Sequence, residues 1–285
     1  MNQRKGFFAL IFAAVILGTF GVLVRELAGT FGDFAQVFIR SLFATLVIVV
    51  IVLYKKISPF KMDKNNLKYI LLFSIFFPSS VLFFTISVNL IKATNTLFML
   101  YAGSLIFTAI FGRIFFKEKF TFKHTAALIL AFVGLSMFVY PFSFETLSLG
   151  IVLGIFAGLC EGVSHTLRRL MKGLKREVIV FYQSFSGALI ALGLLLFSHS
   201  LFIKEFHISS IFVGLLFGVL LVSMGYLLAY GFGNFDVNAG TIVLSTELFF
   251  AMVINAMFLQ EYPTSYEFIG GLLIFSATAI ISLKN

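Results

Sequence analysis

Long apolar runs, separated by short polar segments, recur along the whole chain. A run of about 20 residues suffices for an α-helix to cross the roughly 30 Å hydrocarbon core of a bilayer. The runs do not alternate apolar and polar residues, as the strands of a membrane β-barrel do. The pattern therefore predicts an all-α membrane protein with ten transmembrane helices, near residues 7–27, 34–54, 67–89, 93–115, 122–141, 148–168, 178–198, 209–230, 237–259 and 265–283.

Composition supports a lipid environment. Of the 285 residues, 60% are hydrophobic and 12% are charged, whereas an ordinary soluble domain carries roughly twice that charge. The single cysteine, Cys160, excludes an intramolecular disulfide. The first apolar run is too long for a signal-peptide core, so we expect it to be retained as the first helix.

Charge placement predicts the orientation. If the N-terminus is cytoplasmic, 17 of the 21 lysines and arginines lie in cytoplasmic segments. Only Arg25, Lys92 and Lys204 lie outside, and Arg40 lies within a span. This asymmetry obeys the positive-inside rule and places both termini in the cytoplasm, in what we expect to be a bacterial inner membrane. The net charge of +9 therefore reflects topology, and no nucleic-acid partner is expected.

The two halves of the chain resemble each other. A shift of 143 residues aligns Asn95 with Asn238 and Glu118 with Glu261, and a shift of 144 aligns further pairs: Gly6 with Gly150, Gly18 with Gly162, and Arg25 with Arg169. We therefore expect two five-helix repeats, residues 1–143 and 144–285, which an odd number of spans inverts relative to each other. Inverted repeats are typical of secondary transporters, whose substrate site lies near the membrane midplane.

The segments "FFKEKFT" and "FLQEYPT", which follow the fourth and ninth spans, resemble those of EamA-type proteins in the drug/metabolite transporter superfamily. "ILGTFGVLVREL" and "FAQVFIRSLFATL" are similar to the first two helices of that family, with Arg40 at the position of a recurrent arginine. "STELFFAMVINAMFLQE" resembles its ninth helix, with Glu247 where the family often has Glu-Pro. The resemblance implies a ten-helix transporter of small molecules.

Two carboxylic acids lie near the middle of predicted spans. Glu161 and Glu247 would each cost about 2.5–3.5 kcal/mol if they were ionised at the bilayer centre. We therefore expect both to face the bundle interior, where burial favours a protonated carboxyl group and suits a proton carrier. A neutral, hydrogen-bonded structural role is the alternative.

The span that contains Glu161 also carries a ladder of glycines, Gly150, Gly154, Gly158 and Gly162. At 100° per residue, Glu161 and His165 share an arc of about 120° with these glycines. A glycine at every fourth position by itself indicates close helix packing or dimerisation. The acid and the imidazole on the same arc favour an interior face that both packs and lines a cavity.

Other polar residues within spans are candidate ligands. Arg40 could neutralise a glutamate or hold a substrate carboxylate or phosphate through its forked guanidinium group. Tyr101 and Ser104 share a face of the fourth span, and Gln183 and Tyr226 could add hydrogen bonds. The candidate site residues are thus Glu161, Glu247, Arg40, His165, Tyr101, Ser104, Gln183 and Tyr226.

The chain lacks a G-x-x-x-x-G-K-[ST] loop and any convincing metal-binding cluster, so neither ATP-driven transport nor a cofactor is expected. The sequence favours a secondary active exporter of small metabolites, amino acids or drug-like compounds, with protons exchanged through Glu161 or Glu247. Proton-independent exchange or uptake is the alternative transport mode. An intramembrane enzyme using Glu161 and His165, or a scaffold assembled through the glycine ladder, fits less well. Either a monomer or a homodimer is compatible with the sequence.

Overall fold

The computed structural model describes residues 2–119, 121–137, 140, 149–198 and 207–282. Within these ranges the chain forms twelve helices, because the first and ninth spans each consist of two helices. The helices are α1 (Gln3–Leu17), α2 (Phe20–Ala28), α3 (Asp33–Tyr54), α4 (Lys64–Leu90), α5 (Ala93–Phe116), α6 (Phe122–Met137), α7 (Leu149–Leu170), α8 (Arg176–Phe197), α9 (Ile208–Asn234), α10 (Val237–Leu244), α11 (Glu247–Phe258) and α12 (Ser265–Ser282).

The expected ten-span membrane architecture is confirmed. Eight spans are long and apolar enough to cross a membrane, and the shorter apolar helices α6 and α12 complete the ten. Large apolar side chains cover much of the outer surface, including Phe12, Val50, Leu53 and Phe212, as expected where lipid is the solvent. The boundary expected at residues 143 and 144, and the end of the span expected at 122–141, lie outside the described residues.

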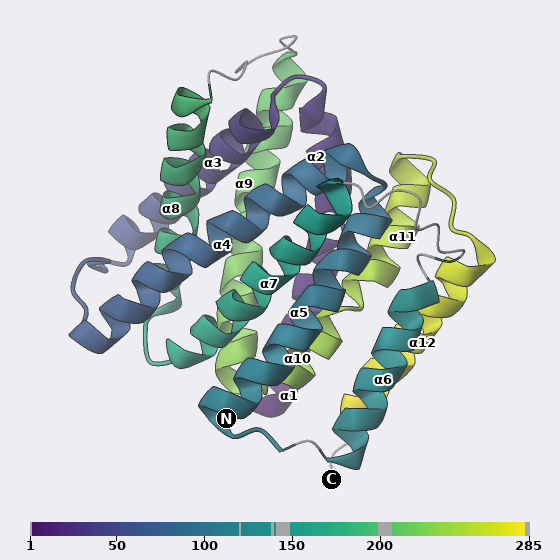
Figure 1. Ribbon diagram of the computed structural model, residues 1–285. Helices are drawn as coiled ribbons and strands as arrows, with labels where there is room; N and C mark the ends of the chain where they lie inside the picture. The colour runs from purple at the N-terminus through teal and green to yellow at the C-terminus, as the bar shows by residue number, and fades with distance from the viewer. Residues whose placement is uncertain (1, 120, 138–139, 141–148, 199–206, 283–285) are drawn as a thin grey trace.

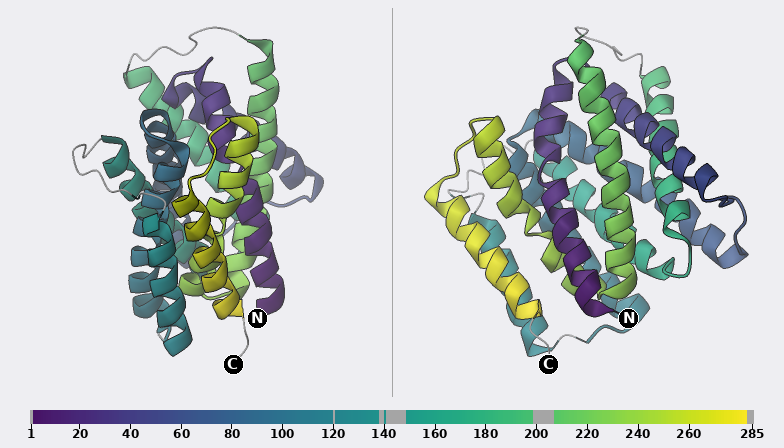
Figure 2. Two further views of the ribbon diagram at one scale, coloured as in Figure 1. Left: turned by 90° about the vertical axis from the view of Figure 1, so that its right-hand side faces the viewer. Right: turned by 180° about the vertical axis from the view of Figure 1, so that it is seen from behind.

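The spans run alternately up and down, so α1 begins and α12 ends at the same end of the bundle (Figure 1). We name this end the basic end, because the α3–α4, α5–α6 and α7–α8 connections there carry Lys55, Lys117 and Lys172. The opposite end is named the far end. Helices α6 and α12 pair along one edge of the bundle, and α3 and α8 lie along the opposite edge (Figures 1 and 2).

The structure confirms the inverted repeat. Helices α4 and α9 each have 27 residues and begin at Lys64 and Ile208, which are 144 positions apart. Helices α3 and α8 each have 22 residues and begin 143 positions apart, at Asp33 and Arg176. Each corresponding pair runs in opposite directions across the bundle (Figure 1). The chain therefore contains the same five-span unit twice, in opposite orientations.

The first and ninth spans are broken, whereas the sequence pattern predicts continuous helices. Helix α1 ends before Gly18 and Thr19, and the Thr19 hydroxyl donates to the Ile16 carbonyl at 2.7 Å. Helix α10 ends before Ser245 and Thr246, whose hydroxyls donate to helix carbonyls at 2.7 Å each. Such side-chain hydrogen bonds compete with the helical pattern. The broken spans contact each other.

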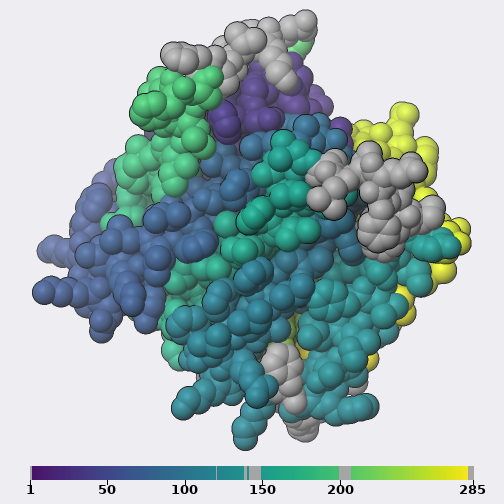
Figure 3. All heavy atoms as spheres, viewed as in Figure 1, coloured from purple at the N-terminus to yellow at the C-terminus, as the bar shows by residue number. Residues whose placement is uncertain are grey.

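The glycine ladder of α7 allows close helix packing. A Cβ atom at Gly158 would overlap the carbonyl oxygen of Leu100 in α5. A Cβ atom at Gly154 would lie 2.8 Å from Met99, also in α5, and one at Gly150 would lie 2.8 Å from Ile91, which follows α4. Helix α7 thus packs against α4 and α5 along most of its length (Figure 3). This contact brings Glu161 into the centre of the bundle.

Candidate functional site

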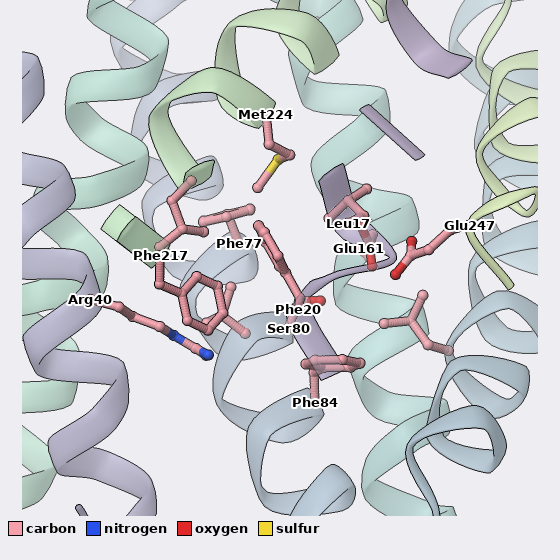
Figure 4. A pocket seen from close by; sticks show the side chains of 13 residues that line it. Leu17, Phe20, Arg40, Phe77, Ser80, Phe84, Glu161, Phe217, Met224 and Glu247 are labelled. Atoms are coloured by element: carbon pink, nitrogen blue, oxygen red, sulfur yellow. The ribbon is translucent and has the colours of Figure 1, made fainter. Parts of the chain in front are cut away.

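A pocket lies in the interior of the bundle, between helices of the two repeats. The first repeat contributes residues of α1 to α5, and the second contributes residues of α7, α9 and α11. The empty space of the pocket, counted together with the open solvent at its mouth, is about 510 Å³. Its charged side chains are Arg40, Glu161 and Glu247, and its aromatic side chains are Phe20, Phe77, Phe84 and Phe217 (Figure 4).

Glu247 joins the two repeats. It is the first residue of α11, directly after the break in the ninth span, and its side chain is buried. The hydroxyl group of Tyr101, on α5 of the first repeat, donates a hydrogen bond to Glu247 Oε2. Tyr101 itself is buried and does not line the pocket. The tyrosine therefore acts as the partner that holds the carboxyl group in place.

Glu161 is the first of a series of polar side chains that extends from the pocket into the protein interior. His165, one turn later on α7, places Nε2 at 3.6 Å from Glu161 Oε1. The other ring nitrogen, Nδ1, lies 3.1 Å from Nη1 of Arg168, and Nη2 of Arg168 donates to Gln183 Oε1 at 3.1 Å. The amide nitrogen of Gln183 reaches the carbonyl oxygen of Leu221 at 3.4 Å. This series, which we name the polar chain, thus runs from the pocket through α7 to α8 and α9.

The hydrogen bond with Arg168 determines the tautomer of a neutral His165. Arginine only donates hydrogen bonds, so Nδ1 of His165 accepts the bond from Arg168. The ring proton of a neutral His165 then resides on Nε2, the nitrogen that faces Glu161. The ring also stacks on Phe232, with the centroids 4.2 Å apart. Rotation of the imidazole ring away from Glu161 is therefore restrained on two sides.

Arg40 occupies the opposite side of the pocket from Glu247 (Figure 4). It lies on α3, is 1% exposed, and donates from Nη2 to Thr85 Oγ1 at 2.5 Å. Its guanidinium carbon lies 4.5 Å from the centre of the Phe217 ring, a cation–π contact. The remaining nitrogens, Nε and Nη1, are buried and have no hydrogen-bond partner among the described residues.

Two candidates lie away from the pocket lining. Ser104 is buried where α5 meets the glycines of α7, and its hydroxyl has no hydrogen-bond partner in the described structure. Tyr226 lies nearer the basic end, with Lys55 Nζ 5.9 Å from the centre of its ring. The pocket therefore contains Arg40, Glu161 and Glu247. Tyr101 and His165 contact two of these residues, and Gln183 lies farther along the polar chain.

Sequence reasoning missed two members of the site. Arg168 is fully buried and lies over the rings of Phe73 and Phe77, at 5.0 and 5.1 Å. Its position beside Arg169 suggested the solvated end of a helix. Thr85, the partner of Arg40, lies within an apolar stretch of α4 that gives no sign of a polar contact.

The comparisons with known proteins agree with this architecture. The family model described as "EamA-like transporter family" matches twice, at residues 4–140 and 148–283. The chain belongs to the EamA-like transporter family. The EamA resemblance noted in the sequence is thus confirmed, and this member is a multi-pass membrane protein of a family of transporters.

Solved structures support the fold. A structure described only as "Crystal structure of protein" matches with a TM-score of 0.81 and 15% sequence identity, over 99% of each chain. At this identity the likeness extends to the fold alone. No curated protein sequence matches the chain.

Proposed function

We propose that this EamA-family protein is a secondary active transporter that exports a small metabolite, amino acid or drug-like molecule by alternating access. The proposal rests mainly on the pocket between the two inverted repeats, which contains Glu161 and Glu247. A site between inverted repeats becomes accessible to each side of the membrane when one repeat moves against the other. Glu161, Glu247, Arg40, His165, Tyr101, Ser104, Gln183 and Tyr226 remain the proposed site and coupling residues.

The two carboxyl groups support coupling to protons. Acidic residues inside a membrane are costly and often form proton relays. Glu247 contacts Tyr101 of the other repeat, and Glu161 lies beside His165, so each acid has a neighbour that can donate a hydrogen bond. Exchange of a proton for substrate at these acids would drive export with the proton gradient.

The charge distribution supports an orientation. The basic end would face the cytoplasm of a bacterial cell, in agreement with the positive-inside rule. Both termini would then be cytoplasmic, and substrate would leave through the far end. Monomer and homodimer both remain possible for such a carrier.

Transport by proteoliposomes with an imposed pH gradient tests this function. We expect flux of a substrate identified by thermal-shift screening to follow the pH gradient in the wild type. Glu161→Gln and Glu247→Gln should each reduce gradient-driven flux at least tenfold. Glu26→Gln, which changes an exposed acid at the far end, is the matched control and should retain wild-type flux.

The same experiment separates the alternatives. If both pocket variants keep gradient-driven flux, proton coupling through these residues is wrong. Flux that needs sealed vesicles but not a pH gradient would indicate exchange or uptake without protons. Chemical turnover by the detergent-solubilised protein would instead indicate an enzyme.

A further inference from the structure

We propose that Arg40 forms the anion-binding end of the pocket, and that the substrate is an organic carboxylate with an apolar or aromatic body. This inference rests on the proposed function and names the substrate class for it. It starts from the two guanidinium nitrogens of Arg40, Nε and Nη1, which are buried beside the pocket and have no hydrogen-bond partner in the part of the chain that the structure describes.

An arginine at this depth needs an anion. Its guanidinium group keeps its charge at neutral pH, and a buried charge is costly unless it is paired. Among the described residues, no carboxylate lies within ion-pair distance of Arg40. Its only direct polar partner there is the neutral hydroxyl of Thr85. The planar fork of an arginine matches the two oxygens of a carboxylate.

The rest of the pocket specifies the body of the ligand. Phe217 lies against the guanidinium group, and Phe20, Phe77 and Phe84 cover the space between Arg40 and the two glutamates. Aromatic walls favour an apolar, preferably planar, group. Glu161 and Glu247, on the opposite side, can accept hydrogen bonds from an amino group if the ligand has one.

Three small probes test the charge preference directly. Binding of 3-phenylpropanoate, phenethylamine and phenylalanine to the purified full-length protein would be measured by calorimetry at one pH and ionic strength. These compounds present the same ring with a carboxylate, with an amine, or with both. We expect 3-phenylpropanoate to bind at least tenfold more tightly than phenethylamine. Tighter binding of phenylalanine than of 3-phenylpropanoate would add an ammonium subsite at the glutamates.

Variants of Arg40 test whether this residue causes the preference for a carboxylate. Arg40→Gln should weaken 3-phenylpropanoate at least tenfold, and Arg40→Lys, which keeps the charge without the fork, should weaken it less. Arg113→Gln, at an exposed arginine, is the matched control and should leave binding unchanged. If the Arg40 variants do not fold, the relative affinities of the wild type for the three probes still test whether the pocket prefers a carboxylate.

Equal or tighter binding of phenethylamine, or unchanged carboxylate binding by a folded Arg40→Gln variant, would overturn the assignment. Binding in detergent needs no gradient. A failure of proton-coupled transport would therefore not contradict carboxylate binding at Arg40. A failure of carboxylate binding would likewise not contradict proton-coupled transport.

At the basic end of the bundle, a set of hydrogen bonds and ion pairs joins the two repeats. At the basic end, Glu118, which follows α5, accepts hydrogen bonds from the backbone N–H groups of Val237 at 2.8 Å and Asn238 at 3.2 Å. These are the first two residues of α10. Arg169, at the end of α7, donates to Glu118 and also to Asp236 at 2.9 Å. We name these contacts the basic-end lock, because they join the first repeat to the second.

The counterpart of Glu118 in the other repeat, Glu261, has the same local backbone. The residues before them, Lys117 and Gln260, are both left-handed, with φ of 53° and 56°. The backbone N–H of each glutamate bonds to the carbonyl oxygen six residues earlier, at 3.2 and 3.3 Å. In both repeats this bond forms at a helix end, directly after the left-handed residue. The two carboxyl groups are therefore presented in the same way, at opposite ends of the bundle.

Their partners nevertheless differ. Glu261 Oε2 is buried without a hydrogen-bond partner in the described structure. Arg25, which the repeat aligns with Arg169, donates to the carbonyl oxygen of Ile91 at 2.9 Å. The Nε atom of Arg25 has no hydrogen-bond partner among the described residues. The side chain of Lys92, the N-cap of α5, makes no capping hydrogen bond and pairs with Glu267 at 2.8 Å. The far end thus holds the parts of a second lock, unassembled.

From this asymmetry we infer that Glu261 pairs with Arg25 and caps α5 when the far end closes, and that the basic-end lock then opens. This inference also rests on alternating access. The two glutamates would then have opposite effects on the conformational equilibrium. Glu118 would stabilise the state with the basic end closed, and Glu261 would stabilise the state with the far end closed.

Distances between spin labels test this inference. Cys160 is the only cysteine, so a Cys160→Ala background permits one label pair at the basic end, Lys119 and Lys172, and another at the far end, Leu90 and Tyr262. Glu118→Gln should lengthen the basic-end distance and shorten the far-end distance. Glu261→Gln should leave the closed basic end unchanged and remove any population with a short far-end distance.

Glu26→Gln, at the exposed acid, is again the control. Shifts of both variants in the same direction, or an unchanged distance distribution in Glu118→Gln, would contradict the inference. Because distances are measured without substrate or a gradient, the result does not depend on proton coupling or on the identity of the solute.

Discussion

Tyr101 and Glu247 lie in different repeats, and a hydrogen bond between their side chains joins the repeats inside the membrane. Its donor and its acceptor are both buried. The contact therefore contributes to stability as well as to the arrangement of the pocket.

We expect Tyr101→Phe to lower the thermal stability of the purified protein. The substitution keeps the ring but leaves the carboxyl group of Glu247 without its donor, and an unsatisfied buried polar group costs about 1–3 kcal/mol. Thermal unfolding in detergent measures the change. Tyr140→Phe, at an exposed tyrosine, should change stability by less than about 0.5 kcal/mol. Equal melting temperatures for Tyr101→Phe and the wild type would show that the hydrogen bond contributes nothing.

Substitution by alanine should change stability with opposite signs at Gly158, in the glycine ladder of α7, and at Gly193, in α8. Gly158→Ala should destabilise the protein by about 1–3 kcal/mol, because the new Cβ would overlap the Leu100 carbonyl oxygen and lie 2.9 Å from the Ser104 nitrogen. Gly193→Ala should stabilise it by about 0.5–1 kcal/mol, because the new Cβ would meet no described atom within 4 Å outside its own stretch of helix, and because alanine favours the helix. Unfolding of the two variants under the same conditions provides the comparison. A stabilised Gly158→Ala protein would exclude close α5–α7 packing.

We expect His165 to carry its proton on Nε2. Nitrogen chemical shifts of ¹⁵N-histidine-labelled protein distinguish this tautomer from the Nδ1 form. Arg168→Met should release Nδ1, so that both tautomers become populated. A dominant Nδ1–H tautomer in the wild type would contradict the hydrogen bond between His165 and Arg168.

The basic-end lock should respond to pH. Burial raises the pKa of Glu118 above its ordinary value of 4.5, and the hydrogen bond from Val237 and the charge of Arg169 oppose this rise. Since the folded state holds this proton more tightly than the unfolded state, the contribution of Glu118 to stability falls as pH rises from about 4.5 through the raised pKa. The difference in unfolding free energy between the wild type and Glu118→Gln should therefore decrease over that window. Thermal unfolding of both proteins as a function of pH measures it, and a difference that grows with pH would contradict the shift.

Much of the fold follows from simple sequence signals, because a bilayer demands long apolar helices. Span length and repeat spacing were enough to predict ten spans and their inversion. The breaks at Gly18–Thr19 and Ser245–Thr246 were not predicted, since a hydroxyl that bonds to its own helix leaves the hydropathy pattern unchanged.

The candidate site was predicted in part. Glu161, Glu247 and Arg40 were recognisable because a charge within an apolar span is costly. Arg168 was not recognised, because its place beside Arg169 suggested a solvated helix end and because its partner Gln183 lies on α8, which only the packing brings near. Ser104 shares a helical face with Tyr101, but Ser104 and Tyr226 both lie outside the pocket lining, since a position within a span does not specify which neighbour a side chain meets.

The broken spans have a consequence for the free-energy landscape. The broken first span packs Gly18 against Phe250, and the unbroken sixth span packs Gly162 against Phe107, the corresponding residue of the other repeat. If the repeats exchanged conformations, similar contacts would form again with the roles reversed. Two states built from similar contacts have similar free energies, so a bound solute or a proton worth a few kcal/mol suffices to change the dominant state. A substitution in one repeat alone removes this balance, and the resting state of the protein is therefore set by small differences between its two halves.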